Sequence, residues 1–148
     1  MIIDELIKLS KIFKEGYTVQ LEDNKLNQYT NYNKPFIVSY LTVIEIRQDK
    51  IVYSNVQHIP TKCIIGGWMD NNIFYIELNQ AFKDKNEALI FAIQNGQKAI
   101  YDIRIGALIT KYHGVKLWII INVKTSTIDK LPTNYRQITD KKEAIHEL

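Results

Sequence analysis

The chain has 148 residues, 46% of them hydrophobic, and its 19 basic and 16 acidic residues leave a formal net charge of +3. This length suits one domain with its own core, so we expect 1–148 to form a single domain. The near balance of charge does not favour nucleic-acid binding, and the longest apolar run, Leu117 to Ile121, is far shorter than the roughly 20 residues that cross a bilayer.

Apolar residues between Ile2 and Phe13 fall at helical spacing with lysines between them, which predicts an amphipathic first helix that ends at Gly16. Charged residues within this stretch exclude a signal peptide. The single Cys63 lies beside two isoleucines, so we interpret it as a buried core thiol in a reducing cytoplasm. The composition, rich in Ile, Lys, Asn and Tyr, suggests the cytoplasm of a low-GC bacterial host.

Alternating apolar positions predict a strand over 17–21. Apolar residues on much of both faces predict a long, central strand over 36–46, which a turn at 48–50 joins to an antiparallel neighbour at 51–53. Between the first two strands, Glu22 to Lys34 is polar and is expected to be a long exposed loop. Its tyrosines, Tyr29 and Tyr32, favour contact with a partner.

The stretch from Gly66 to Asp102 is predicted to fold as one unit of hairpin, helix and returning strand. A strand over 64–69 meets a second strand over 73–78 at a polar turn. The helix, Asp84 to Asn95, starts with a capping box in which Asp84 accepts a hydrogen bond from the amide of Glu87, and Gly96 ends it. A strand over 99–103 follows.

Further strands are expected at 107–110 and 115–123, and a short C-terminal helix is expected near the end of the chain, from Asp140 to Leu148. The fold class that follows is α+β. A single, mostly antiparallel sheet should carry the N-terminal helix and the central helix packed against it.

Chemical motifs are scarce. His58, His113 and His146 are far apart and lack neighbouring ligands, which argues against a metal site built from a local motif. Neither of the glycine-rich phosphate-binding loops is present, so we expect no cofactor.

Two carboxylates, Glu77 and Asp102, lie on predicted strands among apolar and aromatic neighbours. The interpretation that we favour places both on the solvent-facing side of the sheet. The alternative is a general acid–base pair that faces Tyr75 or Tyr101. Trp68, Tyr75 and Tyr101 are interpreted as cross-strand packing pairs in preference to a stacking platform.

Written out as Gly67-Trp68-Met69-Asp70, Asp84-Lys85-Asn86-Glu87-Ala88 and Gln97-Lys98-Ala99-Ile100-Tyr101-Asp102, the middle of the chain resembles a small domain of bacteriophage and prophage proteins. The pattern of that domain is G-W-x-D, D-x-x-E-A and Q-x-A-I-Y-D, often preceded by G-[FY]-T-V, which Gly16 to Val19 match. The resemblance covers 16–103 and departs at Glu77, where such proteins usually have Asp. It implies a phage or mobile-element origin and assigns no reaction.

We therefore expect a non-catalytic phage or prophage protein that inhibits a host process. The expected class is an anti-defence protein that inhibits a CRISPR-type nuclease or sequesters a nucleotide immune signal. Aromatic and arginine residues carry much of the energy at such interfaces. The expected binding residues are Tyr29, Tyr32, Arg47, Trp68, Asp70, Tyr75, Arg104 and Tyr135.

Two alternatives stay open. One is a small enzyme that acts on a nucleotide or a protein side chain through Glu77 and Asp102, with Trp68, Asp70, Tyr75, Gln97 and Tyr101 around them. The other is a structural, virion-associated domain, for which an oligomer such as a homodimer is expected.

Overall fold

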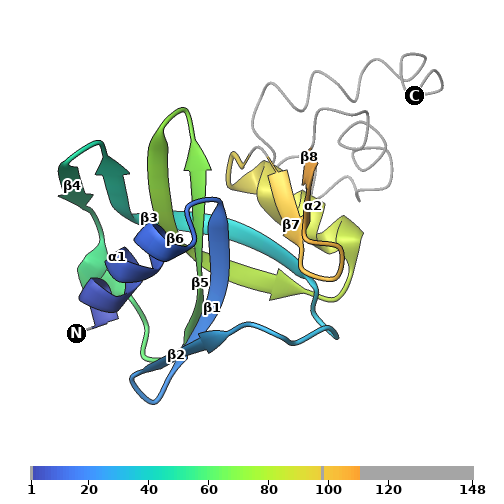
Figure 1. Cartoon of the computed structure of the whole chain (residues 1–148). Helices are drawn as coiled ribbons and strands as arrows, with labels where there is room; N and C mark the ends of the chain where they lie inside the picture. Colours follow the sequence, from blue (N-terminus) through green and yellow to red (C-terminus); the bar gives the residue numbers. More distant parts are fainter. Residues whose placement is uncertain (1, 98, 111–148) are drawn as a thin grey trace. The chain divides into compact units, whose positions relative to one another are not determined.

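The computed structural model describes residues 2–97 and 99–110. They form an α+β fold in which a mostly antiparallel sheet carries an N-terminal and a central helix, as the sequence predicted (Figure 1). No helix among these residues is both long and apolar enough to cross a membrane. The strand expected at 115–123, the C-terminal helix and Tyr135 lie outside the described residues.

The elements are α1 (Ile2–Ile12), β1 (Gly16–Glu22), β2 (Lys25–Gln28), β3 (Phe36–Arg47), β4 (Lys50–Tyr53), η1, a 3-10 helix (Val56–His58), β5 (Cys63–Asp70), β6 (Ile73–Phe82), α2 (Lys85–Gln94), β7 (Ala99–Asp102) and β8 (Ala107–Thr110).

The described chain divides into two compact units. The first consists of residues 2–31 and 39–80, and the second of 32–38, 81–97 and 99–110. Each unit has its own buried hydrophobic cluster. The expectation that 1–148 form a single domain stays a prediction.

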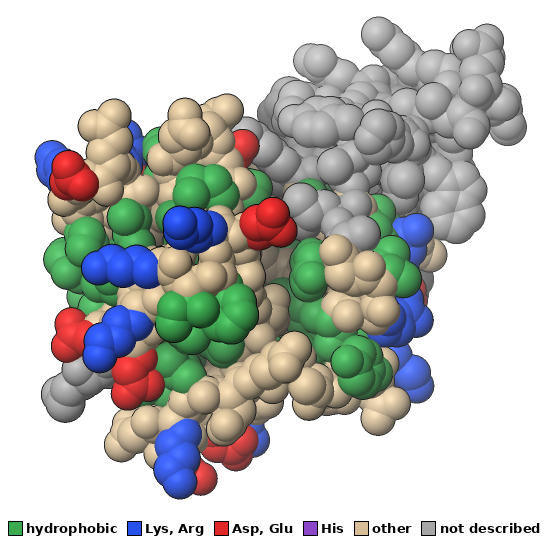
Figure 2. Space-filling view, viewed as in Figure 1, with side chains coloured by type: hydrophobic (Ala, Val, Ile, Leu, Met, Phe, Trp, Pro, Cys, Tyr) green, Lys and Arg blue, Asp and Glu red, His purple; other side chains and the backbone are tan. Residues whose placement is uncertain are grey.

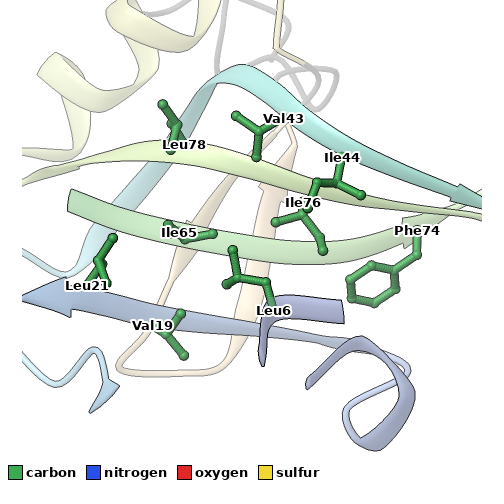
Figure 3. Close-up of a cluster of buried hydrophobic side chains, with 9 residues drawn as sticks. All are labelled: Leu6, Val19, Leu21, Val43, Ile44, Ile65, Phe74, Ile76 and Leu78. Carbon is green, nitrogen blue, oxygen red and sulfur yellow. The ribbon is translucent and has the colours of Figure 1, made fainter. Parts of the chain in front are cut away.

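In the first unit the strands follow the order β2-β1-β5-β6-β3, and β4 pairs with the far end of β3. The side chains of every second residue in a strand point to the same face of the sheet. On one face of these strands most of these side chains are apolar and form a buried cluster. Leu6 of α1 is fully buried in the cluster on this face, together with side chains from β1, β3, β5 and β6 (Figure 3). The Tyr17 hydroxyl of β1 also donates a hydrogen bond to the Leu6 carbonyl oxygen, at 3.1 Å. The N-terminal helix is therefore held against the sheet by both packing and hydrogen bonding.

Strands β5 and β6 form a hairpin whose two-residue loop is Asn71-Asn72. Both residues have positive φ, 50° and 64°. These angles match a type I′ turn, whose twist suits a two-residue hairpin and whose left-handed residues are often Asn. The turn fixes the register, so that Trp68 lies opposite Tyr75 and Gly66 lies opposite Glu77.

The predicted exposed loop from Glu22 to Lys34 is wrong in its first half. Asp23 and Asn24 adopt positive φ and turn the chain into β2, which pairs with β1. The Tyr29 amide then donates to the Thr18 carbonyl oxygen at 3.0 Å, and Tyr29 is only 6% exposed. Tyr32 alone of the two tyrosines is exposed, at 59%.

The expected role of Gly16 as a helix stop is also wrong. The helix ends at Ile12, and Gly16 is the first residue of β1, with φ 140°. A Cβ atom at this position would lie 2.6 Å from the Gly67 carbonyl oxygen of β5. Glycine is needed here for strand pairing, because it lets the backbones of β1 and β5 approach.

In the second unit, the first residues of β3 pair with β7, and β7 pairs with β8. The helix α2 packs its buried residues, among them Leu89 and Ile93, against Phe36, Val38 and Ile100 of these strands. Asp84 caps the helix as predicted, but its carboxylate accepts from the Asn86 amide, at 2.9 Å, and not from that of Glu87. The reciprocal capping box is therefore incomplete, and one side chain performs the capping.

Replacing Asp84 by Ala should lower the free energy of unfolding by about 1 kcal/mol, because the Asn86 amide loses its acceptor at the helix start. Glu87→Gln should change it by no more than a few tenths of a kcal/mol, since Glu87 is exposed and takes no part in the cap. Urea unfolding followed by circular dichroism measures both, with Lys83→Ala as a neighbouring surface control. A larger loss for Glu87→Gln than for Asp84→Ala would contradict this description of the cap.

Candidate functional site

The β5–β6 hairpin gathers three of the residues that the sequence singled out for binding. Trp68 and Tyr75 are direct cross-strand partners, and Asp70 pairs with Ile73 next to the turn. The two rings pack with centroids 5.7 Å apart and planes tilted by 32°. They form the cross-strand pair that the sequence favoured, and both residues remain partly exposed.

Beside this pair lies the buried carboxylate of Glu77, which is 5% exposed. Its Oε2 accepts a hydrogen bond from the Thr42 hydroxyl of β3 at 2.8 Å. Its Oε1 accepts a short hydrogen bond from the indole Nε1 of Trp68 on β5. The expectation that Glu77 points to solvent is therefore wrong, and its side chain ties together three neighbouring strands.

A second polar pair continues the cluster along β6. The Ser39 hydroxyl donates to Oδ1 of Asn79 at 2.5 Å, and Asn79 is 7% exposed. Space for the amide comes from Gly66 on β5, where a Cβ atom would lie 2.2 Å from Nδ2 of Asn79. We call Ser39, Thr42, Trp68, Glu77 and Asn79 the polar cluster.

The chemistry of the polar cluster is that of fixed hydrogen bonds. Both oxygens of Glu77 are engaged by neutral donors, and neither donor is a residue that commonly exchanges protons with substrates. Among the described residues, no group of three or more His, Cys, Asp or Glu side chains could hold a metal ion. The arrangement is suited to holding the Trp68 ring in place.

Asp102 belongs to the second unit and is also buried, at 3% exposed, so its expected solvent-facing position is wrong as well. Its carboxylate accepts three hydrogen bonds from Arg104, one from the backbone amide at 3.0 Å and two from the guanidinium at 3.1 and 2.9 Å. These bonds hold the pKa of Asp102 below its ordinary value of 3.8. The guanidinium also lies 4.9 Å from the centre of the Phe36 ring. Asp102 is thus held as an ionised partner of Arg104, which is unfavourable for a general base.

The other predicted binding residues are dispersed. Arg47 ends β3 and forms an exposed ion pair with Glu45, with Nη2 and Oε2 2.7 Å apart. Tyr32 and Arg104 belong to the second unit, and Tyr29 is buried in the first. Within the first unit, the hairpin is the place where several predicted residues meet.

Cys63 is partly buried at the edge of the first core, and its Sγ lies 3.6 Å from the Pro60 carbonyl oxygen. Burial raises the pKa of the thiol, which keeps it protonated and unreactive. This agrees with a structural thiol, although Cys63 is only partly buried and the expected burial in the core is therefore wrong.

The sequence reasoning missed Ser39, Thr42 and Asn79. Two of them, Ser39 and Thr42, are polar residues in a strand that is apolar on much of both faces, and these exceptions were the available signal. Their partners are 40 and 35 residues away, so no local pattern connects them.

Comparisons of the chain with protein-family models, with curated proteins and with solved structures gave no match.

Trp68→Phe should lower the free energy of unfolding by about 1–3 kcal/mol, because it removes a donor from a buried carboxylate. Tyr75→Phe is the matched control. It keeps the neighbouring ring and removes a hydroxyl that bonds to no other described residue, so we expect a change within about 0.5 kcal/mol. Urea unfolding followed by fluorescence and circular dichroism gives both values. Equal effects would mean that the indole hydrogen bond contributes nothing.

The Asp102–Arg104 pair predicts a dependence of stability on pH. Since the pKa of Asp102 is lowered in the folded chain, its stabilisation is present above 3.8 and is lost as the pH falls below that value. Native protein should therefore be more stable than Asp102→Asn at neutral pH, and the difference should shrink at about pH 3. Chemical denaturation at both pH values tests this, with Asp49→Asn in the β3–β4 turn as the control. A difference that stays constant with pH would contradict it.

Proposed function

We propose that this chain is a non-catalytic phage or prophage protein that binds and inhibits a host defence protein, a CRISPR-type nuclease being the expected class. The observation that carries the proposal is the hydrogen bond from Trp68 to the buried Glu77. It immobilises a partly exposed aromatic pair on a tight hairpin. An aromatic surface that is fixed before binding loses little conformational entropy when a partner docks on it.

The composition of this surface supports a protein partner. Trp68 and Tyr75 offer large, partly apolar rings, and Asp70 adds an acidic group beside them. Their ring separation of 5.7 Å is that of rings in direct contact, so the pair supports docking on its outer surface in preference to a nucleotide between the rings. Tryptophan and tyrosine are frequent at the centres of protein interfaces.

The existing hydrogen bonds of Glu77 and Asp102 weigh against the catalytic alternative. Each carboxylate is already engaged, that of Glu77 by neutral donors and that of Asp102 by Arg104. The hydrogen bonds from Arg104 favour the ionised form of Asp102, which disfavours its use as a proton-transfer group, and both oxygens of Glu77 are occupied by Thr42 and Trp68. The resemblance of 16–103 to phage domains supports the proposed origin.

The test uses a bacterial host whose CRISPR-type nuclease blocks a phage. Expression of the native chain should restore plating of that phage, and the purified chain should retain the nuclease from lysate in a stoichiometric complex. Tyr75→Ala should weaken the affinity by about 2 kcal/mol, or roughly thirtyfold, because half of the aromatic pair is lost.

The matched control is Tyr53→Ala on β4, a tyrosine that is 54% exposed and lies outside the hairpin. It should bind as the native chain does. The proposal fails if Tyr75→Ala and Tyr53→Ala behave alike, or if the chain retains a nucleotide in place of a protein. Substrate turnover that Glu77→Gln abolishes would establish the enzyme instead.

A further inference from the structure

The first unit has a second surface that is suited to binding, the free edge of strand β2, and this edge is separate from the β5–β6 hairpin. Strand β2 (Lys25–Gln28) is the last strand in the order on its side of the sheet, and it pairs with β1 alone among the described strands. An unpaired strand edge presents backbone donors and acceptors that another extended chain can use.

The register shows which groups lie along this edge. The β1–β2 register pairs Val19 with Gln28, and one residue further on the Tyr29 amide donates to the Thr18 carbonyl oxygen. In an antiparallel pair such bonded positions alternate with positions whose backbone groups point away. Leu26 and Gln28 occupy the alternate positions, so their amide and carbonyl groups face outward from β2.

Next to this edge is a hollow of about 250 Å³ between β2 and α1, lined by Glu5, Lys8, Leu9 and Leu26. Leu9 and Leu26 are partly buried at the margin of the core. The volume is below the roughly 300–1,000 Å³ of pockets for drug-sized ligands, which suits a single inserted side chain. Its apolar walls favour an aliphatic one.

The rim of the hollow carries one acidic and one basic group. Glu5 and Lys8 are exposed and lie three residues apart on α1, where Lys8 also has Asp4 as an acidic neighbour one helical turn away. Residues at this spacing are neighbours on one helix face. Figure 2 shows that basic and acidic side chains are interspersed on the side of the molecule where α1 lies, without a field of one sign.

We propose that β2 and this hollow bind an extended peptide segment of a partner protein by strand addition. The segment pairs with the outward backbone groups of Leu26 and Gln28 and inserts one aliphatic side chain between Leu9 and Leu26. On the same face of the peptide, two residues to either side, it carries one acidic and one basic residue that face Lys8 and Glu5. A second copy of this chain is a weaker fit, because a four-residue edge is small beside the roughly 1,200 Å² that stable interfaces bury.

This site goes beyond the proposed function, since it involves neither Trp68 nor Tyr75. Tyr75→Ala should therefore leave peptide binding unchanged, which distinguishes a failure here from a failure of the proposed inhibition.

Two labelled peptides of about seven residues serve as probes, with threonine at alternate positions as in edge strands. One carries aspartate, leucine and lysine in that order at the remaining positions, and the other carries lysine, leucine and aspartate. Fluorescence anisotropy should show saturable binding in the range of about 10–100 μM for one order and about fivefold weaker binding for the other. The double variant Glu5→Lys/Lys8→Glu should reverse this preference.

Gln28→Pro tests the backbone. Proline is tolerated on an edge strand where the amide faces solvent, and it removes one outward donor. It should weaken peptide binding at least about tenfold, whereas Gln28→Thr, which keeps the amide, should bind within about twofold of the native chain. Circular dichroism and thermal unfolding confirm that both variants fold.

Several results would overturn the proposal. They are the absence of saturable binding by either peptide, equal affinity for both orders, an unchanged preference in the double variant, or equal binding by the two Gln28 variants. Self-association of the native chain that Gln28→Pro abolishes would identify a second copy as the occupant and would overturn it as well.

Discussion

The buried carboxylate of Glu77 is the constraint on which the arrangement of the first unit depends. A carboxylate that is removed from water is tolerated only when its oxygens are hydrogen-bonded, because the cost of leaving them unpaired is several kcal/mol. Glu77 meets this requirement with donors from two other strands, Thr42 of β3 and Trp68 of β5. The burial of Glu77 on β6 is therefore favourable only when β3 and β5 lie beside β6 in positions that bring Thr42 and Trp68 to the carboxylate.

The hydrogen bonds of Glu77 also favour one register between β5 and β6. Side chains alternate between the faces of a strand, so a slip of one residue between β5 and β6 would turn Trp68 to the face that α1 covers and leave the carboxylate without its indole donor. The Asn71-Asn72 turn and the absence of a side chain at Gly66 favour the same register by independent means.

The length of the Glu77 side chain is also required for its hydrogen bonds. An aspartate would withdraw the carboxylate by about 1.5 Å, the length of one carbon–carbon bond, which is enough to break a 2.8 Å hydrogen bond.

Much of the fold could be predicted because its signals are local. Runs of apolar residues mark β3, β5 and β6, and Asp84 and Gly96 bound α2 as expected. Strand β2 was missed because it contains one apolar residue, Leu26, and its pairing depends on the positive φ of Asp23 and Asn24, which sequence reasoning did not recognise as a hairpin turn. The fold class can be predicted from the pattern of apolar residues, whereas strand β2 can be predicted only from the turn at Asp23 and Asn24.

The candidate site was predictable only in part, for a different reason. Trp68, Asp70 and Tyr75 are close in sequence, and the hairpin brings them together. The burial of Glu77 depends on a hydrogen bond from Thr42, which is 35 residues away in the sequence. Without that partner, the strand pattern alone predicts that Glu77 faces solvent. A polar residue in a strand that is apolar on both faces is better interpreted as the partner of another buried polar group.

Alternation of side chains also separates the two binding surfaces that we propose. Along β5, Ile65 points into the core that α1 covers, whereas Gly66 and Trp68 belong to the opposite face, which carries Glu77 and Tyr75. Leu26 packs with the first of these faces, since it pairs with Leu21 of the core. The aromatic pair and the β2 hollow therefore lie on opposite faces of one sheet, with β1 between their strands. A peptide held along β2 does not cover Trp68, so one partner can occupy the edge while another docks on the hairpin.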